Sequence, residues 1–253
     1  MKNLFVVLLA LGLVACGKEK DSDKVGNAQL CLDRLASNST PAEVTECVSK
    51  ADGVETSAAY GLRCAGSFMK EGFLNPNKII SAMSQLNGGS SGTVNFMTLI
   101  TFTSTGAIAT DTANSSTAFD YCLRGEGKGS TLLASFGFMA MSVYSFMRLK
   151  AIPNCSGAPL ASGYDFQTCA TSFATSNPAA VIALNDPSTA DAATITIQRS
   201  IGTVLIAASN ISCTGTAANS SLCSTITASI SEAGGVTADP RAIAVRFFLK
   251  LGL

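Results

Sequence analysis

Residues 40–43 read Thr40-Pro41-Ala42-Glu43, and this stretch decides the fold class. A threonine before a proline is typical of a helix start, because the side chain caps a free amide and proline has no N–H to leave unpaired. Glu43, three residues after Thr40, completes a capping box. Similar pairs occur at four further prolines: Asn75-Pro76, Asn177-Pro178, Asp186-Pro187 and Asp239-Pro240. Because an alanine-rich or apolar stretch follows each pair, we predict an all-α chain.

Outward from these starts, the apolar pattern predicts about ten helices, of which the first two form an N-terminal helical hairpin. The predicted segments are 26–37, 41–51, 56–71, 76–86, 93–102, 113–124, 130–149, 178–184, 187–209, 217–232 and 240–251. Segment 187–209 also holds four β-branched residues, at positions 194–197, which would suit a strand. The cap at Asp186 and the length of the segment favour a helix.

The segment between Lys128 and Arg148 contains no charged residue and is long enough to raise the question of a membrane span. One apolar stripe has helical spacing: Leu132, Phe136, Met139, Val143 and Phe146. Polar residues lie on another face: Thr131, Ser135, Ser142 and Ser145. This pattern predicts an amphipathic helix in a soluble core rather than a membrane span.

The N-terminus has the parts of a secretory signal: Lys2, an apolar run from Leu4 to Leu13, and small residues before Cys16. The sequence Leu13-Val14-Ala15-Cys16 resembles the lipobox of bacterial lipoproteins. This resemblance implies that residues 1–15 are removed and that Cys16 carries the lipid, with palmitate among the acyl chains. In that family an Asp after the Cys tends to retain the protein in the inner membrane. Gly17 therefore indicates the outer membrane, facing either the periplasm or the cell surface.

The alternative is an ordinary cleavable signal peptide with a chance cysteine at position 16. On the lipoprotein interpretation, residues 16–25 form the lipidated Cys and a charged tether, and residues 26–253 form an α-helical domain. The glycine-rich segment 125–129 leaves open a division into two subdomains, 26–124 and 130–253.

The composition limits the classes of function. Lys and Arg number 17 and Asp and Glu also number 17, so no basic excess would attract nucleic acid. The chain has no histidine, which excludes catalytic triads that use one and removes the side chain most used for proton transfer near neutral pH. The usual zinc spacings are also missing, and we expect no metal and no cofactor.

Eight cysteines remain beside Cys16, and an even number in an exported chain predicts four disulfides rather than free buried thiols. In the predicted hairpin, Cys31 and Cys47 lie at equal height on facing helices, which predicts their bridge. Proximity in sequence suggests two more pairs, and the last two cysteines are then left for each other. These three pairs are Cys155–Cys169, Cys213–Cys223 and Cys64–Cys122.

Short catalytic motifs occur without their partners. Ser67-Phe68-Met69-Lys70 matches the Ser-x-x-Lys of penicillin-binding proteins and β-lactamases, but the companion motifs of those enzymes are missing. Segment 88–92 matches Gly-x-Ser-x-Gly in a chain without histidine, and segment 125–130 lacks the spacing of a phosphate loop. The acids Asp120, Glu126 and Asp165 are scattered. The C-terminal segment 241–253 is basic and amphipathic, and is expected to dock on the core rather than on a membrane.

These observations predict a lipid-anchored envelope protein with a structural or protein-binding role. Examples are an accessory subunit of an outer-membrane assembly or a binder displayed on the surface. The expected partners are the membrane, through the lipid on Cys16, and another envelope protein. The alternative is a periplasmic hydrolase that uses carboxylates or the pair Ser67 and Lys70.

Overall fold

The computed structural model describes residues 20–72, 100–103, 105, 107–149, 186, 188, 190–213 and 221–251. In these residues the chain forms eight helices and no strand, so the all-α prediction is confirmed. The helices are α2 (Asp21–Leu32), α3 (Pro41–Ser49), α4 (Ser57–Lys70), α7 (Ile108–Arg124), α8 (Lys128–Leu149), α11 (Ala192–Ser212), α12 (Ser221–Ala233) and α13 (Pro240–Leu251). The predicted helices 76–86 and 178–184 lie outside the described residues.

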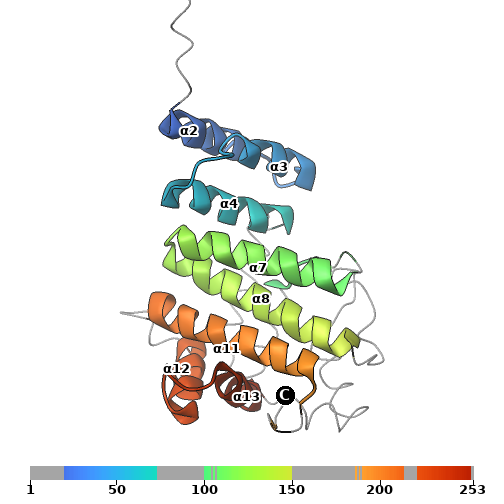
Figure 1. Cartoon of the computed structure of the whole chain (residues 1–253). Helices are drawn as coiled ribbons and strands as arrows, with labels where there is room; N and C mark the ends of the chain where they lie inside the picture. The colour runs from blue at the N-terminus through green and yellow to red at the C-terminus, as the bar shows by residue number, and fades with distance from the viewer. Residues whose placement is uncertain are drawn as a thin grey trace, which may run out of the picture.

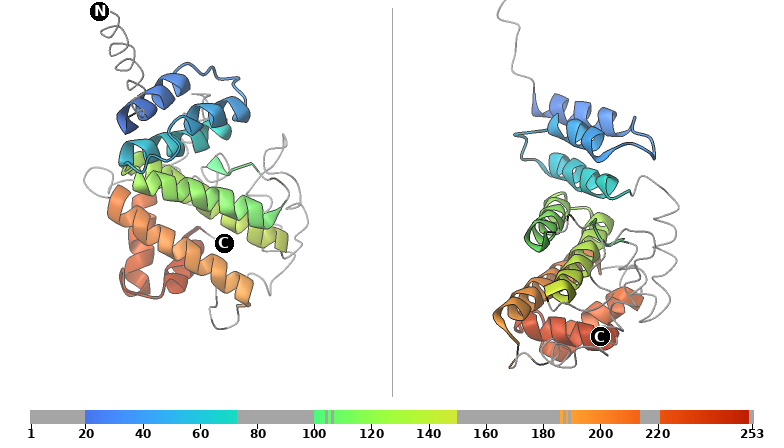
Figure 2. Two further views of the ribbon diagram at one scale, coloured as in Figure 1. Left: turned by 45° about the horizontal axis from the view of Figure 1, so that its top comes forward. Right: turned by 90° about the vertical axis from the view of Figure 1, so that its right-hand side faces the viewer.

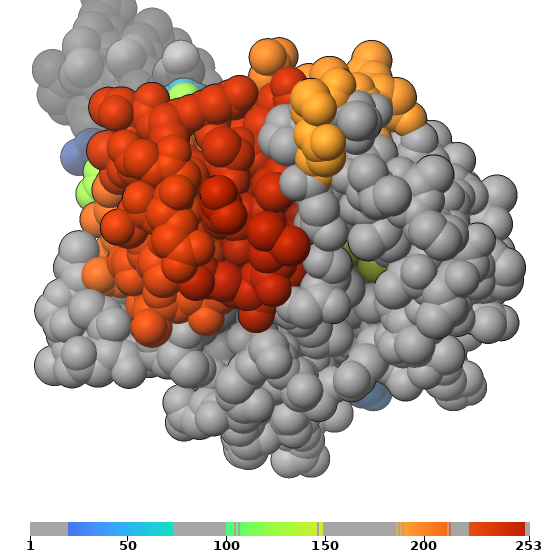
Figure 3. Space-filling view, turned by 90° about the horizontal axis from the view of Figure 1, so that it is seen from below, coloured from blue at the N-terminus to red at the C-terminus, as the bar shows by residue number. Residues whose placement is uncertain are grey.

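The helices are arranged as a stack that follows the order of the chain (Figures 1 and 2). At one end, α2 and α3 contact each other and α4. Below α4 lie α7 and α8, and α11 packs against α8. At the other end, α12 and α13 cover α11 and form a continuous surface (Figure 3). We call α2 and α3 the N-terminal layer. This layer is separated from the C-terminal helices α12 and α13 by the whole height of the stack.

Two of the predicted helix starts have the expected caps. At α3, Glu43 N–H donates to Thr40 Oγ1 at 3.3 Å, and Thr40 N–H donates to Glu43 Oε2 at 2.7 Å. At α13, which begins at Pro240, Arg241 N–H donates to Asp239 Oδ1 at 3.0 Å. The pairs Asn75-Pro76 and Asn177-Pro178 lie outside the described residues.

The predicted start at Asp186 is wrong. Helix α11 begins at Ala192, and its cap is Asp191, whose carboxylate accepts Thr194 N–H at 2.8 Å. Asp186 instead accepts the N–H and the hydroxyl of Ser188 at 2.9 and 2.7 Å. An Asp side chain satisfies a turn in this way as readily as it caps a helix, so the Asp-Pro pair alone could not decide between them.

Other boundaries also differ from the prediction. Helix α2 spans Asp21–Leu32 rather than 26–37, so the second half of the predicted tether 16–25 is helical. Asp21 and Asp23 stand in its first turn, where carboxylates interact favourably with the helix dipole. In the predicted helix 93–102, Thr101 and Phe102 are not helical. Helix α7 begins at Ile108 rather than at 113.

The buried apolar residues form two clusters that meet at α4. The smaller cluster includes Val44 and Leu62 and joins α2, α3 and α4. The larger cluster includes Cys64 and Phe68 of α4 and extends through α7, α8, α11, α12 and α13. Because α7 and α8 share the larger cluster, the core does not divide at segment 125–129, the boundary considered for subdomains 26–124 and 130–253.

Helix α8 is buried on more than the predicted apolar stripe. Phe136, Met139 and Val143 of the apolar stripe are buried, and so are Ser135, Ser142 and Ser145 of the polar face. Serine can be buried in a helix when its hydroxyl bonds to a carbonyl one turn earlier, as Ser135 does to Thr131 O at 2.7 Å. Within the described ranges, no helix has the length and apolar character needed to cross a membrane.

The C-terminal helix docks on the core, as predicted. Ile243, Ala244, Phe247 and Phe248 of α13 are fully buried, whereas Arg246 and Leu249 are exposed. Burial of an aromatic side chain stabilises the fold by about 1.5–3 kcal/mol, so the two phenylalanines hold this helix firmly against α11.

Candidate functional site

Three disulfides cross-link the stack, and all three are among the predicted pairs. Cys31–Cys47 joins α2 to α3, Cys64–Cys122 joins α4 to α7, and Cys213–Cys223 joins the end of α11 to α12. Their Cα–Cα distances are 5.2, 4.8 and 5.3 Å. Cys16 and the predicted pair Cys155–Cys169 lie outside the described residues.

A cluster of arginines and tyrosines surrounds the Cys64–Cys122 bridge. It consists of Glu55, Tyr60, Arg63, Tyr121 and Arg124, and we call it the arginine–tyrosine cluster. The Arg63 guanidinium lies 5.0 Å from the ring centre of Tyr60 and 5.9 Å from that of Tyr121. The Arg124 guanidinium lies 4.0 Å from the ring centre of Tyr60. The short sequences around Tyr60 and Tyr121 are similar, and the fold brings them together.

Every ionic group of the arginine–tyrosine cluster has a partner. Glu55 accepts a hydrogen bond from Tyr60 Oη and lies 4.0 and 3.9 Å from the nitrogens of Arg63 and Arg124. Arg63, which is 9% exposed, also donates to Ala51 O at 3.0 Å. These contacts join Tyr60 and Arg63 of α4 to Tyr121 and Arg124 of α7.

A second ion pair, which the sequence did not suggest, lies between α7 and α8. Asp111 is 1% exposed, and its Oδ2 is 3.6 Å from Arg148 Nη1. Its other oxygen accepts the N–H and the hydroxyl of Thr105 at 2.6 and 2.7 Å. A buried carboxylate needs such partners because its desolvation is costly. The two residues are far apart in sequence, and no local pattern links them.

The candidate catalytic pair of the hydrolase alternative is not assembled. Ser67 Oγ donates to Arg63 O at 2.9 Å, which is a bond to its own helix, and Lys70 is exposed in the last turn of α4. Segment 125–130 does not form a phosphate loop, because α8 already begins at Lys128 and Ser130 Oγ donates to Gly127 O. Segment 88–92 and Asp165 lie outside the described residues.

Asp120 and Glu126, the two scattered acids among the described residues, lie in different surroundings. Asp120 pairs with Arg124 at 3.7 Å on the surface of α7, and Glu126 stands in the turn after α7 with a φ of 59°. In the described part of the chain, no three His, Cys, Asp or Glu side chains are placed to hold a metal ion together.

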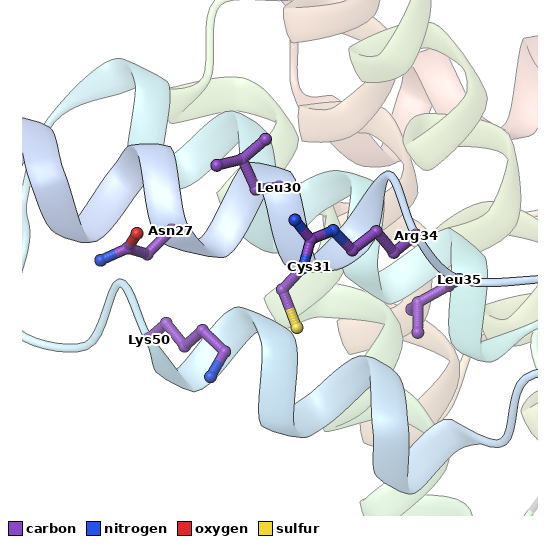
Figure 4. Close-up of a pocket in the computed structure, with 6 residues that line it drawn as sticks. All are labelled: Asn27, Leu30, Cys31, Arg34, Leu35 and Lys50. Carbon is purple, nitrogen blue, oxygen red and sulfur yellow. The ribbon is translucent and has the colours of Figure 1, made fainter.

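A hollow opens between α2 and α3 (Figure 4). Its volume is about 680 Å³. The lining residues are Asn27, Leu30, Cys31, Arg34, Leu35 and Lys50. The charged residues of this lining are both cations, and Leu30 is 56% exposed. Sequence reasoning missed the hollow, because it depends on how α2 and α3 pack.

The outer face of α7 is exposed and uncharged over its first three turns. Its exposed side chains there are Ala109, Thr110, Ala113, Asn114, Ser116 and Thr117. The one charged residue in the same stretch, Asp111, faces the core. We call this surface the α7 face; helix α7 itself lies on the outside of the stack (Figure 2).

Comparison with protein-family models, with curated proteins and with solved structures finds no match for this chain. The class that the fold and its sites define is thus an all-helical, disulfide-linked domain.

Proposed function

We propose that this chain is a lipid-anchored envelope protein that acts by binding or supporting another envelope protein. Its place would be the outer membrane, as an accessory subunit of an assembly or as a surface binder. The anchor is the lipid on Cys16. Three disulfides support an oxidising compartment, because such bridges persist outside the cytosol.

The observation that carries the binding role is the α7 face. Charged residues are depleted at the centre of protein interfaces, because each must lose its hydration when the partner binds. The side chains of the α7 face are small and uncharged, so a partner helix or sheet could approach closely at a smaller desolvation cost than charged side chains would impose. The buried side of α7 is fixed by Cys64–Cys122 and by the Asp111–Arg148 pair, which keeps the exposed side rigid.

We also propose that α2 and α3 act as a helical hairpin at the membrane-proximal end of the domain. Helix α2 begins at Asp21, five residues after Cys16. A linker of that length spans at most about 17 Å. The N-terminal layer would then lie next to the lipid, and the α7 face would stand farther from it, where a partner could reach it.

The experiment is capture of partners from cross-linked envelopes with the full chain and with a Thr117→Lys variant. The variant places a charge on the α7 face, at its C-terminal end, and should lose at least tenfold of any partner that the wild-type chain recovers. Ser231→Lys on α12 is the matched control, since Ser231 is also exposed on a helix. Recovery of no stable partner, or equal recovery with Thr117→Lys and wild type, would contradict the role of this face.

A further inference from the structure

We propose that the hollow between α2 and α3 binds the phosphodiester headgroup of an anionic glycerophospholipid in the membrane that holds Cys16. This inference rests on the proposed anchor for its biological setting. The site itself is argued from the described residues. Such a site would let the N-terminal layer bind the anionic lipids of the membrane.

The charge of the lining fits a phosphate. Arg34 in the turn after α2 and Lys50 after α3 approach the hollow from its two sides (Figure 4). Within the described ranges, neither of these side chains forms an ion pair or a hydrogen bond. Two unpaired cations that share a hollow repel each other, and an anion between them removes that repulsion. The guanidinium fork of Arg34 can hold two phosphate oxygens at once.

The apolar part of the lining fits the rest of a lipid. Leu30 and Leu35 lie beside the two cations, and Leu30 is largely exposed. Side chains of this kind lie favourably at the boundary between headgroups and acyl chains, where the leucine enters the apolar region and the cations stay among the phosphates. A free inorganic phosphate would leave Leu30 exposed, so the lining favours the lipid over the ion.

The position of the hollow allows it to reach the membrane. Asn27, the first residue of its lining, is six residues into α2, which is about 9 Å along the helix axis. With the short linker from Cys16, the hollow can lie on the lipid surface when α2 is parallel to it. A tether this short gives a high effective concentration of headgroups, so even a weak site would be occupied.

The acidic residues around the hollow limit which residues can attract an anionic membrane. The acids on and beside α2 and α3 outnumber the cations there, so the layer as a whole would be repelled by an anionic membrane. The acids are Asp21, Asp23, Asp33, Glu43, Glu46 and Asp52, and the cations besides Arg34 and Lys50 are Lys20 and Lys24. Binding must therefore depend on Arg34 and Lys50 rather than on the charge of the layer as a whole.

The test measures binding of the mature chain from residue 16, with Cys16→Ser so that no lipid is attached, to vesicles. Vesicles of phosphatidylcholine are compared with vesicles that also contain phosphatidylglycerol. We expect binding only where phosphatidylglycerol is present, and we expect Arg34→Gln with Lys50→Gln to lower the partition coefficient on the order of 30-fold. Arg199→Gln with Arg246→Gln changes the net charge equally at exposed positions on α11 and α13, and should change the coefficient less than twofold.

Equal losses in the two double variants, or equal binding to both kinds of vesicle, would overturn the proposal. A circular dichroism spectrum identical to that of the wild type shows that the variants fold. In a further measurement, inorganic phosphate is added to the vesicles at matched ionic strength. Release of the protein by phosphate would mean that the site binds free anions rather than lipid headgroups. Because this chain carries no lipid, a negative result would leave the Cys16 anchor and the partner role of the α7 face untouched.

Discussion

Gly202 of α11 lies against the first residue of α13. A Cβ at this position would overlap the carbonyl group of Pro240, and backbone cannot move aside as a flexible side chain can. Alanine usually stabilises a helix interior by about 1 kcal/mol relative to glycine. At Gly202 we expect the opposite: Gly202→Ala should lower the free energy of unfolding by about 1–3 kcal/mol, because α11 and α13 must separate.

The control for this substitution is Gly26→Ala in α2, where an added Cβ meets no atom within 4 Å. This variant should raise the free energy of unfolding by about 0.5–1 kcal/mol. Urea unfolding, followed by circular dichroism, measures both changes. Changes of the same sign would show that the close approach of α11 and α13 does not limit residue 202.

The charge of Glu43 makes the stability of the α3 cap depend on pH. The backbone N–H and then the hydroxyl of Thr40 hold the pKa of Glu43 below its ordinary value of 4.5. Because the pKa is lowered in the folded state, the carboxylate stabilises the fold above the unfolded pKa, and this stabilisation is lost as the pH falls through the folded pKa. Glu43→Gln can still cap the helix but does not titrate.

We therefore expect wild type to melt above Glu43→Gln near pH 7 and the difference in melting temperature to shrink below about pH 4.5. Thermal melts of both proteins between pH 7 and pH 3 measure this difference. A difference that stayed constant over this range would mean that the cap does not depend on the charge of residue 43.

At the scale of the helices, the disulfides should differ in their contribution to stability. Cys64–Cys122 closes a loop with a sequence separation of 58, against 16 for Cys31–Cys47 and 10 for Cys213–Cys223. The entropy lost by the unfolded chain grows with loop length, which gives about 4 kcal/mol for the first bridge and about 3 kcal/mol for each of the others.

Paired Cys→Ala variants, compared by urea unfolding, should follow this order. Removal of Cys64–Cys122 also loosens α4 from α7, so it should have the largest effect on the melting temperature. A larger loss from Cys213–Cys223 would show that local packing, rather than chain entropy, decides the order.

The sequence predicted those helices whose limits are local. Thr40-Pro41 and Asp239-Pro240 mark true starts, because the cap and the proline act within one turn. Asp186-Pro187 failed because Asp191 is an equally good cap five residues later, and the choice depends on where α11 packs. The pattern in α8 separates its serines from the apolar stripe, but it cannot show that the serines are buried too, because their burial depends on α7 and α11, which both pack against α8.

The candidate sites, like the helix boundaries, could be predicted only where local sequence determines them. Cysteine positions on facing helices predicted Cys31–Cys47 from local geometry. The arginine–tyrosine cluster, the Asp111–Arg148 pair and the hollow all join residues from different helices. Nothing in the sequence near Arg34 indicates that Lys50 will share its surroundings, because their approach is a result of the packing of α2 on α3.

At the scale of the whole molecule, we expect Cys16→Ser to separate attachment from folding. The substitution removes the proposed lipid but changes no residue of the described core. The protein should therefore no longer be attached to the membrane by a lipid, and the mature chain should keep its melting temperature. Fractionation, labelling with palmitate and a thermal melt of the mature chain measure these effects. Incorporation of palmitate into the Cys16→Ser chain would mean that the lipid is attached elsewhere.

The order of the stack also determines how the protein would respond to mechanical tension. A pull between a lipid at Cys16 and a partner on α7 enters through α2 and passes through α3 and α4. The Cys31–Cys47 and Cys64–Cys122 bridges lie along this route, and the chain between each pair cannot lengthen. Outside both loops, the described part of this route consists of α2 before Cys31 and the chain from the end of α3 to Cys64 in α4. The domain would therefore transmit a load from the membrane to its partner with little extension, as a stiff link rather than a spring.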